Sequence, residues 1–361
     1  MAVPAHPAFS PASILIIRLS ALGDVIRTLP LLPPLRARFP AARLGWLCEP
    51  AQKPVVEVQP LVDEVLEFPR GDLARSLRSG HLLRAGSRLR ATLATIRRWR
   101  PQVVLDAQGT YKSALLMRLS GAPLRIGFAR GAAREYIPWA ATHHVTPVAA
   151  RQSRVEKALS LLAPLAADPS LAAAGLPRQA EAATLAESIW ASKPGRYRIL
   201  MCPGASSRQH YKRWPPRSFA AAAAGLAAGG ATVRIAWGPG EEELAREVAA
   251  NAGDAAHLLP TTSLLFLAEL LRTADLFIGN DSGPMHLAWL VGTPVVALYG
   301  ATDPIVNAPW GQGHRQVAVA TAQRLARGRD PSLMAEIEPA RVVAAAQEIL
   351  AGVNPSSGWR P

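Results

Sequence analysis

The hydrophobic positions of this chain fall into short, fully apolar runs that alternate with longer stretches of helical periodicity. Apolar runs rich in branched residues and bounded by Gly, Pro, Asp or Ser are typical of strands buried on both faces of a sheet. In the first half they predict strands at 13–19, 43–47, 65–68, 103–106, 125–128 and 144–146. In the second half they predict strands at 198–202, 232–237, 274–279 and 295–300.

Helical segments lie between these strands. They are predicted at 25–39, 75–98, 111–119, 155–166, 218–228, 241–251, 264–272 and 339–350, with one more from about 282 to 291. Strands that alternate with helices of this length indicate an α/β protein with parallel, doubly wound sheets. The alanine-rich stretch 167–194 has weak periodicity. We therefore expect two domains, an N-terminal one at 1–175 and a C-terminal one at 176–361.

Residues 275–304 contain one complete βαβ unit with the features of an anion-binding site. Asp281 and Ser282 offer N-cap oxygens, Gly283 allows close approach of the backbone, and Pro284 suits the first helical turn. The N–H groups and the positive dipole end of such a helix can bind a phosphate. An ordinary capped crossover has the same pattern, so the helix start alone leaves both interpretations open.

The charge of the chain is positive and unevenly distributed. The formal net charge is +14, and residues 1–190 hold 24 Lys/Arg against 13 Asp/Glu, whereas the rest hold 16 against 13. Nine arginines and one acid, Asp72, lie between Arg70 and Arg100. Such a stretch can meet phosphates, an anionic bilayer or nucleic acid, or it can be a solvated helix face. Trp99 is its one aromatic residue, which disfavours a platform for stacking bases.

Several classes of protein are disfavoured by what the sequence lacks. Two cysteines make a disulfide framework improbable and suit a reducing cytoplasm. The uncharged stretch 282–302 is punctuated by Gly and Pro, so we do not expect a membrane span. The chain has no Gly-x-Gly-x-x-Gly for a dinucleotide, no Gly-x-Ser-x-Gly elbow, no Asp-x-Asp pair and no histidine spacing typical of a metal site. We therefore expect neither a cofactor nor a metal.

Two predicted turns of the first domain place polar side chains at the carboxyl edge of its sheet. In the first turn Asp24 begins a helix, where it is either a cap or a general base for an incoming hydroxyl. In the other turn Asp106, Gln108 and Lys112 either line an acceptor pocket or serve as turn residues and a solvated lysine.

The second domain carries a loop suited to a diphosphate. Ser206 and Ser207 follow a strand, and Lys212 supplies a fixed cation a few residues later. A polar surface loop is the alternative. Glu242 lies after another strand, where it either holds a ribose diol or simply begins a helix.

Taken together, these motifs resemble glycosyltransferase family 9, the bacterial lipopolysaccharide core heptosyltransferases. The segments that carry the resemblance are RLSALGDV (18–25), KRWP (212–215), GNDSGPMHL (279–287) and GATDP (300–304). Within the family, LDAQGTYKS (105–113), GFARGAAREY (127–136) and the VEK that begins at Val155 look most like the heptosyltransferase I members. The resemblance implies a GT-B fold, with two Rossmann-like domains facing across a cleft and the last helix packing back toward the N-terminal domain.

The resemblance also implies a role for each matching residue. Asp24 would be the catalytic base, and Lys212 would act both in catalysis and in donor binding. The other donor-binding residues would be Ser206, Ser207, Glu242, Asp281, Ser282, Gly283 and His286. The acceptor-binding residues would be Arg70, Arg75, Arg78, Asp106, Gln108, Lys112 and Arg134.

The reaction implied by the family is an inverting, metal-independent transfer of heptose from ADP-heptose to Kdo of Kdo2-lipid A. There are two alternatives. One is a transferase of the same family for another sugar or a later core acceptor, and the other is a sugar-nucleotide-binding protein without catalysis. We expect a monomer that does not bind nucleic acid and lies in the cytoplasm, peripherally at the inner membrane, where the anionic lipid acceptor would use the basic stretch.

Overall fold

The computed structural model describes residues 10–149 and 151–352, and within it the chain divides into two compact units. They span Met1–Pro177 and Arg178–Pro361, close to the boundary predicted after residue 175. Among the described residues, no helix is both long and apolar enough to span a bilayer.

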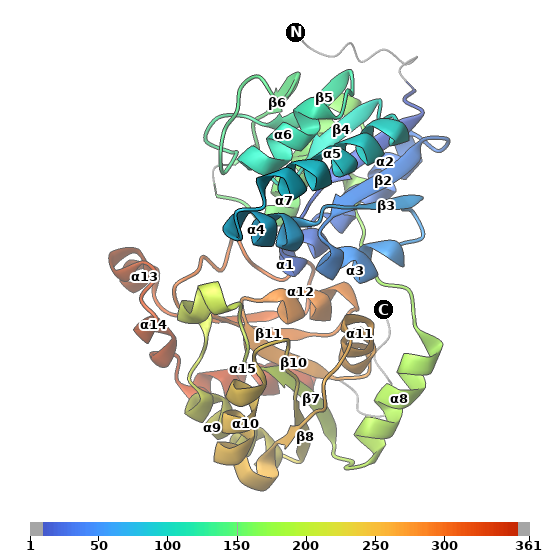
Figure 1. The fold of residues 1–361 in the computed structure, drawn as a ribbon. Helices are drawn as coiled ribbons and strands as arrows, with labels where there is room; N and C mark the ends of the chain where they lie inside the picture. Colours follow the sequence, from blue (N-terminus) through green and yellow to red (C-terminus); the bar gives the residue numbers. More distant parts are fainter. Residues whose placement is uncertain (1–9, 150, 353–361) are drawn as a thin grey trace. The chain divides into compact units, whose positions relative to one another are not determined.

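The first unit is built on a six-stranded sheet (Figure 1). Its strands are β1 (Ser13–Ile17), β2 (Arg43–Cys48), β3 (Glu64–Glu67), β4 (Val103–Asp106), β5 (Leu124–Phe128) and β6 (His143–Val145). They lie in the order β3-β2-β1-β4-β5-β6, and every neighbouring pair is parallel. Every residue of the central strand β1 is buried, as expected of a parallel sheet covered on both faces.

The helices of the first unit connect these strands. They are α1 (Leu22–Ile26), α2 (Leu32–Arg38), α3 (Lys53–Glu57), α4 (Arg70–Arg78), α5 (Leu82–Trp99), α6 (Tyr111–Leu119) and α7 (Arg154–Leu159). Ile96 of α5 and Met117 of α6 pack in one core cluster with Leu15 and Ile17 of β1. Ile16 points to the opposite face because side chains alternate along a strand, and it is fully buried there.

The second unit repeats this architecture. Its strands are β7 (Tyr197–Cys202), β8 (Ala231–Ile235), β9 (His257–Leu258), β10 (Leu276–Asn280), β11 (Val295–Tyr299) and β12 (Arg315–Ala318). Its helices are α8 (Ala180–Ala191), α9 (Pro216–Ala228), α10 (Glu242–Ala252), α11 (Leu264–Arg272), α12 (Gly283–Leu290), α13 (Thr321–Arg327), α14 (Ser332–Ala335) and α15 (Pro339–Ala351). The last helix, α15, packs on α9 and β12, and its predicted return toward the N-terminal domain stays a prediction.

The two sheets have the same topology. The second has the order β12-β11-β10-β7-β8-β9, so each sheet, counted from its own first strand, has the Rossmann order 3-2-1-4-5-6. The predicted fold class, α/β with two Rossmann-like, doubly wound units, is therefore confirmed. The strand order reverses between β1 and β4 and again between β7 and β10. Ligands of such sheets bind outside the carboxyl ends of the strands at this reversal.

Three predicted helices are divided in the structure. The one expected over 155–166 is α7 followed by a 3-10 turn at Ser160–Leu165. The helix expected over 25–39 consists of α1, a 3-10 turn at Leu29–Leu31 and α2, because Pro30 and the Pro33–Pro34 pair carry no amide hydrogen for a continuous helix. The helix expected over 75–98 is two helices, α4 and α5, separated near Gly80, whose φ of +70° suits glycine. The strands β9 and β12 were too short or too polar for the apolar pattern to predict.

Candidate active site

The reversal point of the first sheet brings two βα turns together. Ile17 of β1 lies in register with Asp106 of β4, so the segments that leave these strands start side by side. Arg18 follows β1 directly, and its guanidinium donates to the carbonyl of Ala107 in the neighbouring turn. The Gln108 side-chain oxygen accepts from the backbone N–H of Leu19 at 3.0 Å. The two turns are therefore joined by hydrogen bonds into one continuous surface at the carboxyl edge of the sheet.

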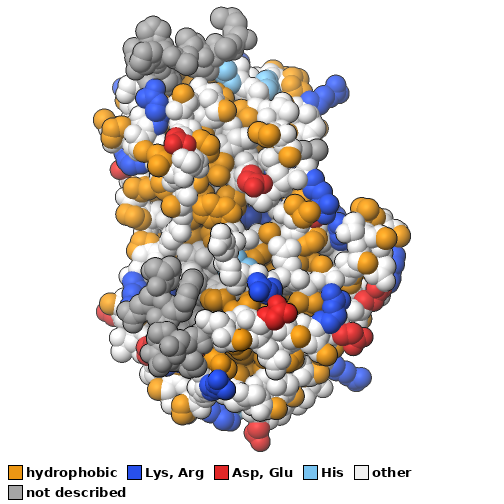
Figure 2. Space-filling model, turned by 180° about the vertical axis from the view of Figure 1, so that it is seen from behind, with side chains coloured by type: hydrophobic (Ala, Val, Ile, Leu, Met, Phe, Trp, Pro, Cys, Tyr) orange, Lys and Arg blue, Asp and Glu red, His pale blue; other side chains and the backbone are white. Residues whose placement is uncertain are grey.

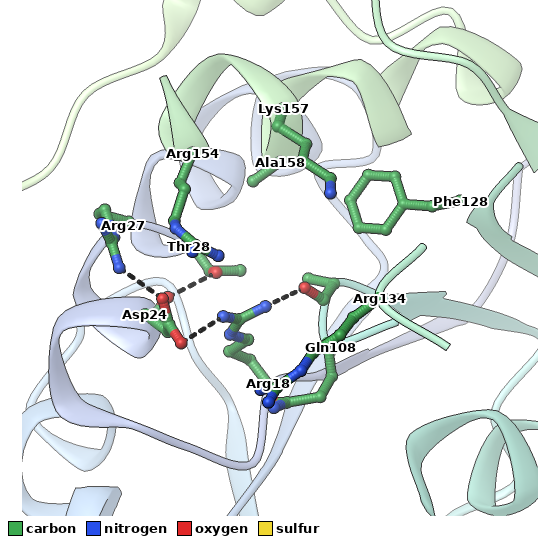
Figure 3. A pocket seen from close by; sticks show the side chains of 11 residues that line it. Arg18, Asp24, Arg27, Thr28, Gln108, Phe128, Arg134, Arg154, Lys157 and Ala158 are labelled. Atoms are coloured by element: carbon green, nitrogen blue, oxygen red, sulfur yellow. Dashed lines mark hydrogen bonds and ion pairs between the residues drawn. The ribbon is translucent and has the colours of Figure 1, made fainter. Parts of the chain in front are cut away.

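Asp24 lies in the first turn of α1, between two arginines (Figure 3). Its Oδ2 is 2.8 Å from Nη2 of Arg18, and its Oδ1 accepts from Arg27. Burial raises the pKa of this carboxyl, but Arg18, Arg27 and Arg154 together lower it more, so its pKa lies well below the ordinary value. The carboxylate is therefore ionised and fixed in orientation at neutral pH.

The pocket beside Asp24 has a large excess of positive charge. It has a volume of about 70 Å³ and contains a single carboxylate, that of Asp24. Its cationic lining residues are Arg18, Arg27, Arg134, Arg154 and Lys157. A pocket with five cations and one carboxylate favours a ligand that carries several negative charges.

Lys157 is a partly buried cation of this pocket. Its ammonium lies 4.8 Å from the centre of the Phe128 ring (Figure 3). It also donates to the carbonyl of Ala132. Burial and the nearby charges of Arg154 and Arg18 lower the pKa of Lys157. An anion in the pocket would relieve this repulsion, so the cluster is electrostatically prepared for one.

The structure adds pocket residues to which the sequence assigned no role. Arg27, Arg154, Lys157 and Phe128 line the same pocket as the predicted residues Asp24, Gln108 and Arg134. Arg27 lies three positions after Asp24, a spacing that places two side chains on one helix face. That spacing was the one local signal. Arg154 and Lys157 come from α7, far along the chain. Lys157 belongs to the VEK segment of the family resemblance, but the sequence assigned no site role to it or to Arg154.

Asp106 has a different environment from the one predicted. Its side chain is buried, and its carboxylate accepts from the N–H groups of Gln108 and Gly109 and from the Ser113 hydroxyl. It thereby holds the turn after β4, and this geometry gives no support to its predicted contact with an acceptor. Lys112 is exposed on α6.

Asp106→Asn is expected to preserve the fold near neutral pH, whereas Asp106→Ala is expected to cost about 2–4 kcal/mol, because it leaves buried N–H groups unpaired. Burial raises the pKa of Asp106 to about 6. The folded state therefore holds this proton more tightly than the unfolded chain, and this group's contribution to stability falls as the pH rises from about 4 to about 6. Chemical unfolding across that range measures both effects. If the stability of Asp106→Asn depends on pH in the same way as that of the wild type, the titrating group is not Asp106.

The reversal point of the second sheet is organised by a buried amide. Asn280 ends β10; its side chain accepts from the N–H of Trp214 at 3.1 Å and donates to the carbonyl of Pro203 at 2.8 Å. It thus joins the loop after β7, the segment that carries Lys212, and the start of α12. The sequence did not single it out, although one amide at the end of an apolar strand is a usable signal.

Lys212, Asp281 and His286 lie together at this point, and their role in donor binding stays a prediction. Nζ of Lys212 is 2.9 Å from Oδ2 of Asp281, and both side chains are largely buried. The other Asp281 oxygen lies 3.8 Å from Nε2 of His286. His286 accepts at Nδ1 from the indole N–H of Trp289, which fixes the orientation of its ring.

The start of α12 offers further polar groups. Ser282 occupies the N-cap position, but its side chain makes no capping bond. Its hydroxyl oxygen is buried and has no hydrogen-bond partner among the described residues. An orphaned hydroxyl at a helix N-terminus, next to Gly283, is suited to a phosphate oxygen.

The other predicted donor residues lie after β7 and at the start of α10. Ser206 is exposed at the start of a 3-10 turn, and the side chain of Ser207 lies outside the described part of the chain. Glu242 pairs with Arg246 on the surface of α10. Its neighbour Glu241 lies against the loop after β7, so close to Gly204 that a Cβ there would come within 1.9 Å of the carboxylate.

The three arginines predicted to meet an acceptor lie along α4. Arg70 pairs with Glu49, whose carboxylate also accepts from the Ser20 hydroxyl in the turn before Asp24. Arg75 pairs with Asp72 and is mostly exposed, and Arg78 is exposed. Through Glu49, Arg70 is therefore linked to the turn that precedes Asp24, whereas the other two arginines are exposed farther along α4.

Comparison with known proteins agrees with the resemblance found in the sequence. A family model described as glycosyltransferase family 9 (heptosyltransferase) matches residues 90–336, more than half of the chain. The chain belongs to glycosyltransferase family 9. It is therefore a glycosyltransferase, and the paired polar sites at the two reversal points belong to a member of this family.

Individual relatives give the same result. Lipopolysaccharide heptosyltransferase 1 of Pseudomonas aeruginosa is 30% identical over 307 residues, which cover 83% of this chain and 81% of the relative. The crystal structure of the family 9 glycosyltransferase from Veillonella parvula has a TM-score of 0.75 at 21% identity and covers 95% of this chain and 98% of that one. E. coli heptosyltransferase WaaC with ADP-2-deoxy-2-fluoro heptose has a TM-score of 0.70 at 23% identity, with coverage of 93% and 99%. These likenesses show the GT-B fold.

Proposed function

We propose that this transferase moves L-glycero-D-manno-heptose from ADP-heptose to Kdo of the lipopolysaccharide inner core, with inversion and without a metal. The observation that carries the proposal is the pocket at the first reversal point, where five cations surround the single carboxylate of Asp24. Kdo is a sugar acid, and lipid A adds phosphates, so this acceptor offers negative charge for such a pocket. The Pseudomonas aeruginosa relative carries the name lipopolysaccharide heptosyltransferase 1.

The second unit supplies the groups that a nucleotide diphosphate needs. Lys212, the orphaned hydroxyl of Ser282 and the N-terminus of α12 would bind the diphosphate and stabilise the charge that grows on departing ADP. Asp281 holds Lys212, and His286 lies beside them. We also assign donor contacts to Ser206, Ser207 and Gly283, and either Glu242 or Glu241 to the ribose. The structural relative WaaC is described with an ADP-sugar analogue.

Asp24 would take the proton of the attacking hydroxyl. Transfer builds positive charge on the anomeric carbon, and a hydroxyl oxygen that bonds to this carbon becomes strongly acidic. A carboxylate with a lowered pKa is therefore still an adequate base at that stage. Arg18 and Arg27 keep it ionised and oriented before reaction.

The acceptor contacts follow from the pocket lining. Gln108, Arg134, Arg154 and Lys157 lie at the pocket and would bind the carboxylate and hydroxyls of the acceptor sugar. Arg70, with Arg75 and Arg78 farther along α4, would meet its remaining anionic groups. Because charge does not identify one sugar acid, a later core acceptor is the second candidate.

One experiment tests the proposal directly. Purified protein is incubated with ADP-heptose and Kdo2-lipid A in the presence of EDTA, and the lipid is analysed by mass spectrometry. We expect a gain of a single heptose. Product only with a heptosylated core would move the acceptor to a later step, product only after metal is restored would overturn metal independence, and no product with either acceptor would overturn the proposed reaction.

The remaining predictions concern the state of the protein in the cell. We propose that it is a monomer, that it binds no nucleic acid, and that it works in the cytoplasm at the surface of the inner membrane. The lipid nature of the acceptor supports the last point.

A further inference from the structure

The turn between α4 and α5 exposes an unusual number of leucines. Leu77, at the end of α4, is 55% exposed, and Leu82 and Leu83, at the start of α5, are 67% and 93% exposed. The two helices pack against each other and lie on the side of the first unit turned to the viewer in Figure 1. Leu89 and Leu93, farther along α5, pack against the core instead. The exposed leucines are therefore confined to the turn.

Arginines surround these leucines without matching acids. Asp72, the one acid between residues 70 and 100, pairs with Arg75 and Arg88. Arg78 and Arg84 stand next to the leucines in sequence, and no described acidic side chain pairs with either of them. Across the second unit on the face in Figure 2, by contrast, acidic side chains lie near basic ones. The helix pair α4–α5 is thus apolar at its turn and strongly positive beside the turn.

This combination distinguishes between the possible partners. A single-stranded nucleic acid would use exposed aromatic rings, but Trp99, the one aromatic residue of the stretch, is buried. A second copy of the chain would bring two such helix pairs of the same sign together, which is unfavourable. A bilayer with anionic headgroups satisfies both features, because leucines enter the interface while arginines remain at the phosphates.

We propose that the α4–α5 turn docks on an anionic lipid bilayer, with Leu77, Leu82 and Leu83 in the interface and Arg78 and Arg84 at the headgroups. Arg78 is also one of the arginines proposed to meet the acceptor, whereas Leu77, Leu82, Leu83 and Arg84 have no assigned part in the transfer and would bind bulk lipid. It would hold the protein where a lipid-linked acceptor is presented.

Vesicle binding tests the proposal without donor or acceptor, so its outcome is independent of the proposed reaction. The full chain is sedimented with phosphatidylcholine vesicles that contain or lack phosphatidylglycerol. We expect binding only to the anionic vesicles, weakened by salt. Leu82→Ser/Leu83→Ser should lower the partition coefficient about tenfold, and Arg78→Gln/Arg84→Gln by about 25-fold, since one basic residue at an anionic surface changes it about fivefold. The control Leu185→Ser alters a leucine of α8 that is 53% exposed and should change nothing.

A site-specific probe then locates the contact. Cys48 and Cys202 are buried, and burial raises the pKa of both thiols, to about 12 for Cys48, so a new surface cysteine can be labelled selectively. A polarity-sensitive dye at Leu83→Cys should shift to the blue on anionic vesicles and be quenched by brominated lipid, whereas the dye at Leu185→Cys should not respond.

Three outcomes would overturn the proposal. They are absence of binding to anionic vesicles, binding that both double variants retain, and a dye at position 83 that stays in water while the protein is bound. Sedimentation velocity adds a fourth. A wild-type dimer that Leu82→Ser/Leu83→Ser converts to monomer would identify the turn as an interface between copies.

Discussion

Asp24→Asn is expected to lower the rate of heptose transfer about 10²- to 10⁴-fold, the usual contribution of a general base, while the affinity for ADP-heptose stays unchanged. The substitution preserves the shape of the side chain, but it removes the negative charge between Arg18 and Arg27 and replaces one of the two acceptor oxygens with an NH2 donor. Single-turnover transfer measures the chemical step, and calorimetry with ADP measures donor binding. Full turnover in Asp24→Asn would show that Asp24 is not the general base.

Stability needs its own control, because Asp24 also neutralises two arginines. The lowered pKa of its carboxyl means that it stabilises the fold above the pKa of the unfolded chain, and that this stability is lost as the pH falls through the lower folded value. Asp24→Asn should therefore melt earlier than the wild type at neutral pH. Asp63→Asn is the matched control, since Asp63 pairs with Arg36, accepts from the N–H of Leu44, and also has a lowered pKa. It should lose stability but keep its turnover.

The same low pKa makes a further distinction possible within this prediction. A base that is already ionised throughout the neutral range gives no acid limb there in the pH profile of kcat/KM. Lys157 must stay protonated to bind an anionic acceptor, so its lowered pKa would instead give an alkaline limb at a lower pH than an ordinary lysine would, and we expect that limb to disappear in Lys157→Met.

Helices and strands were predicted accurately where capping residues next to them in the sequence define their ends. The strand at 103–106 and the helices at 111–119 and 264–272 were predicted with their observed bounds. Thr110 caps α6 in a capping box with Ser113, and Ser263 caps α11, so each helix start is encoded within four residues. At 25–39 and 75–98, proline and glycine interrupt an otherwise helical pattern. Hydrophobic periodicity alone predicted one helix in each range, whereas the structure has shorter helices separated at these residues.

The predicted site was less complete than the fold, because its contacts are long-range. Asp24 is prominent in the sequence, and Arg18 and Arg27 lie within six residues of it, but Arg154 and Lys157 come from α7, about 130 residues farther along the chain. Asn280 joins segments 66 and 77 residues away. Glu241 and Glu242 are indistinguishable as acids at a helix start, yet only Glu241 packs against Gly204. Spacing along the chain does not contain this information.

Lys212→Met is expected to weaken ADP binding about 10- to 100-fold, because it removes a charge-assisted hydrogen bond to the diphosphate. It should also destabilise the second unit by about 3–5 kcal/mol, because the carboxylate of Asp281, whose side chain is 4% exposed, loses the ammonium of Lys212. Calorimetry with ADP and thermal unfolding measure the two effects separately. Lys193→Met is the matched control, since Lys193 is the other lysine of this unit and is exposed, and it should alter neither.

A double variant separates the two roles of Lys212. Lys212→Met/Asp281→Asn removes both charges of the buried pair, so we expect most of the lost stability to return, because no uncompensated charge stays buried. ADP affinity should remain low, since Asp281 acts by holding Lys212 and its carboxylate would otherwise repel a diphosphate. Recovery of ADP affinity in the double variant would mean that Lys212 only maintains the local structure. The charge on the departing diphosphate would then be met by Ser282 and the N-terminus of α12 alone.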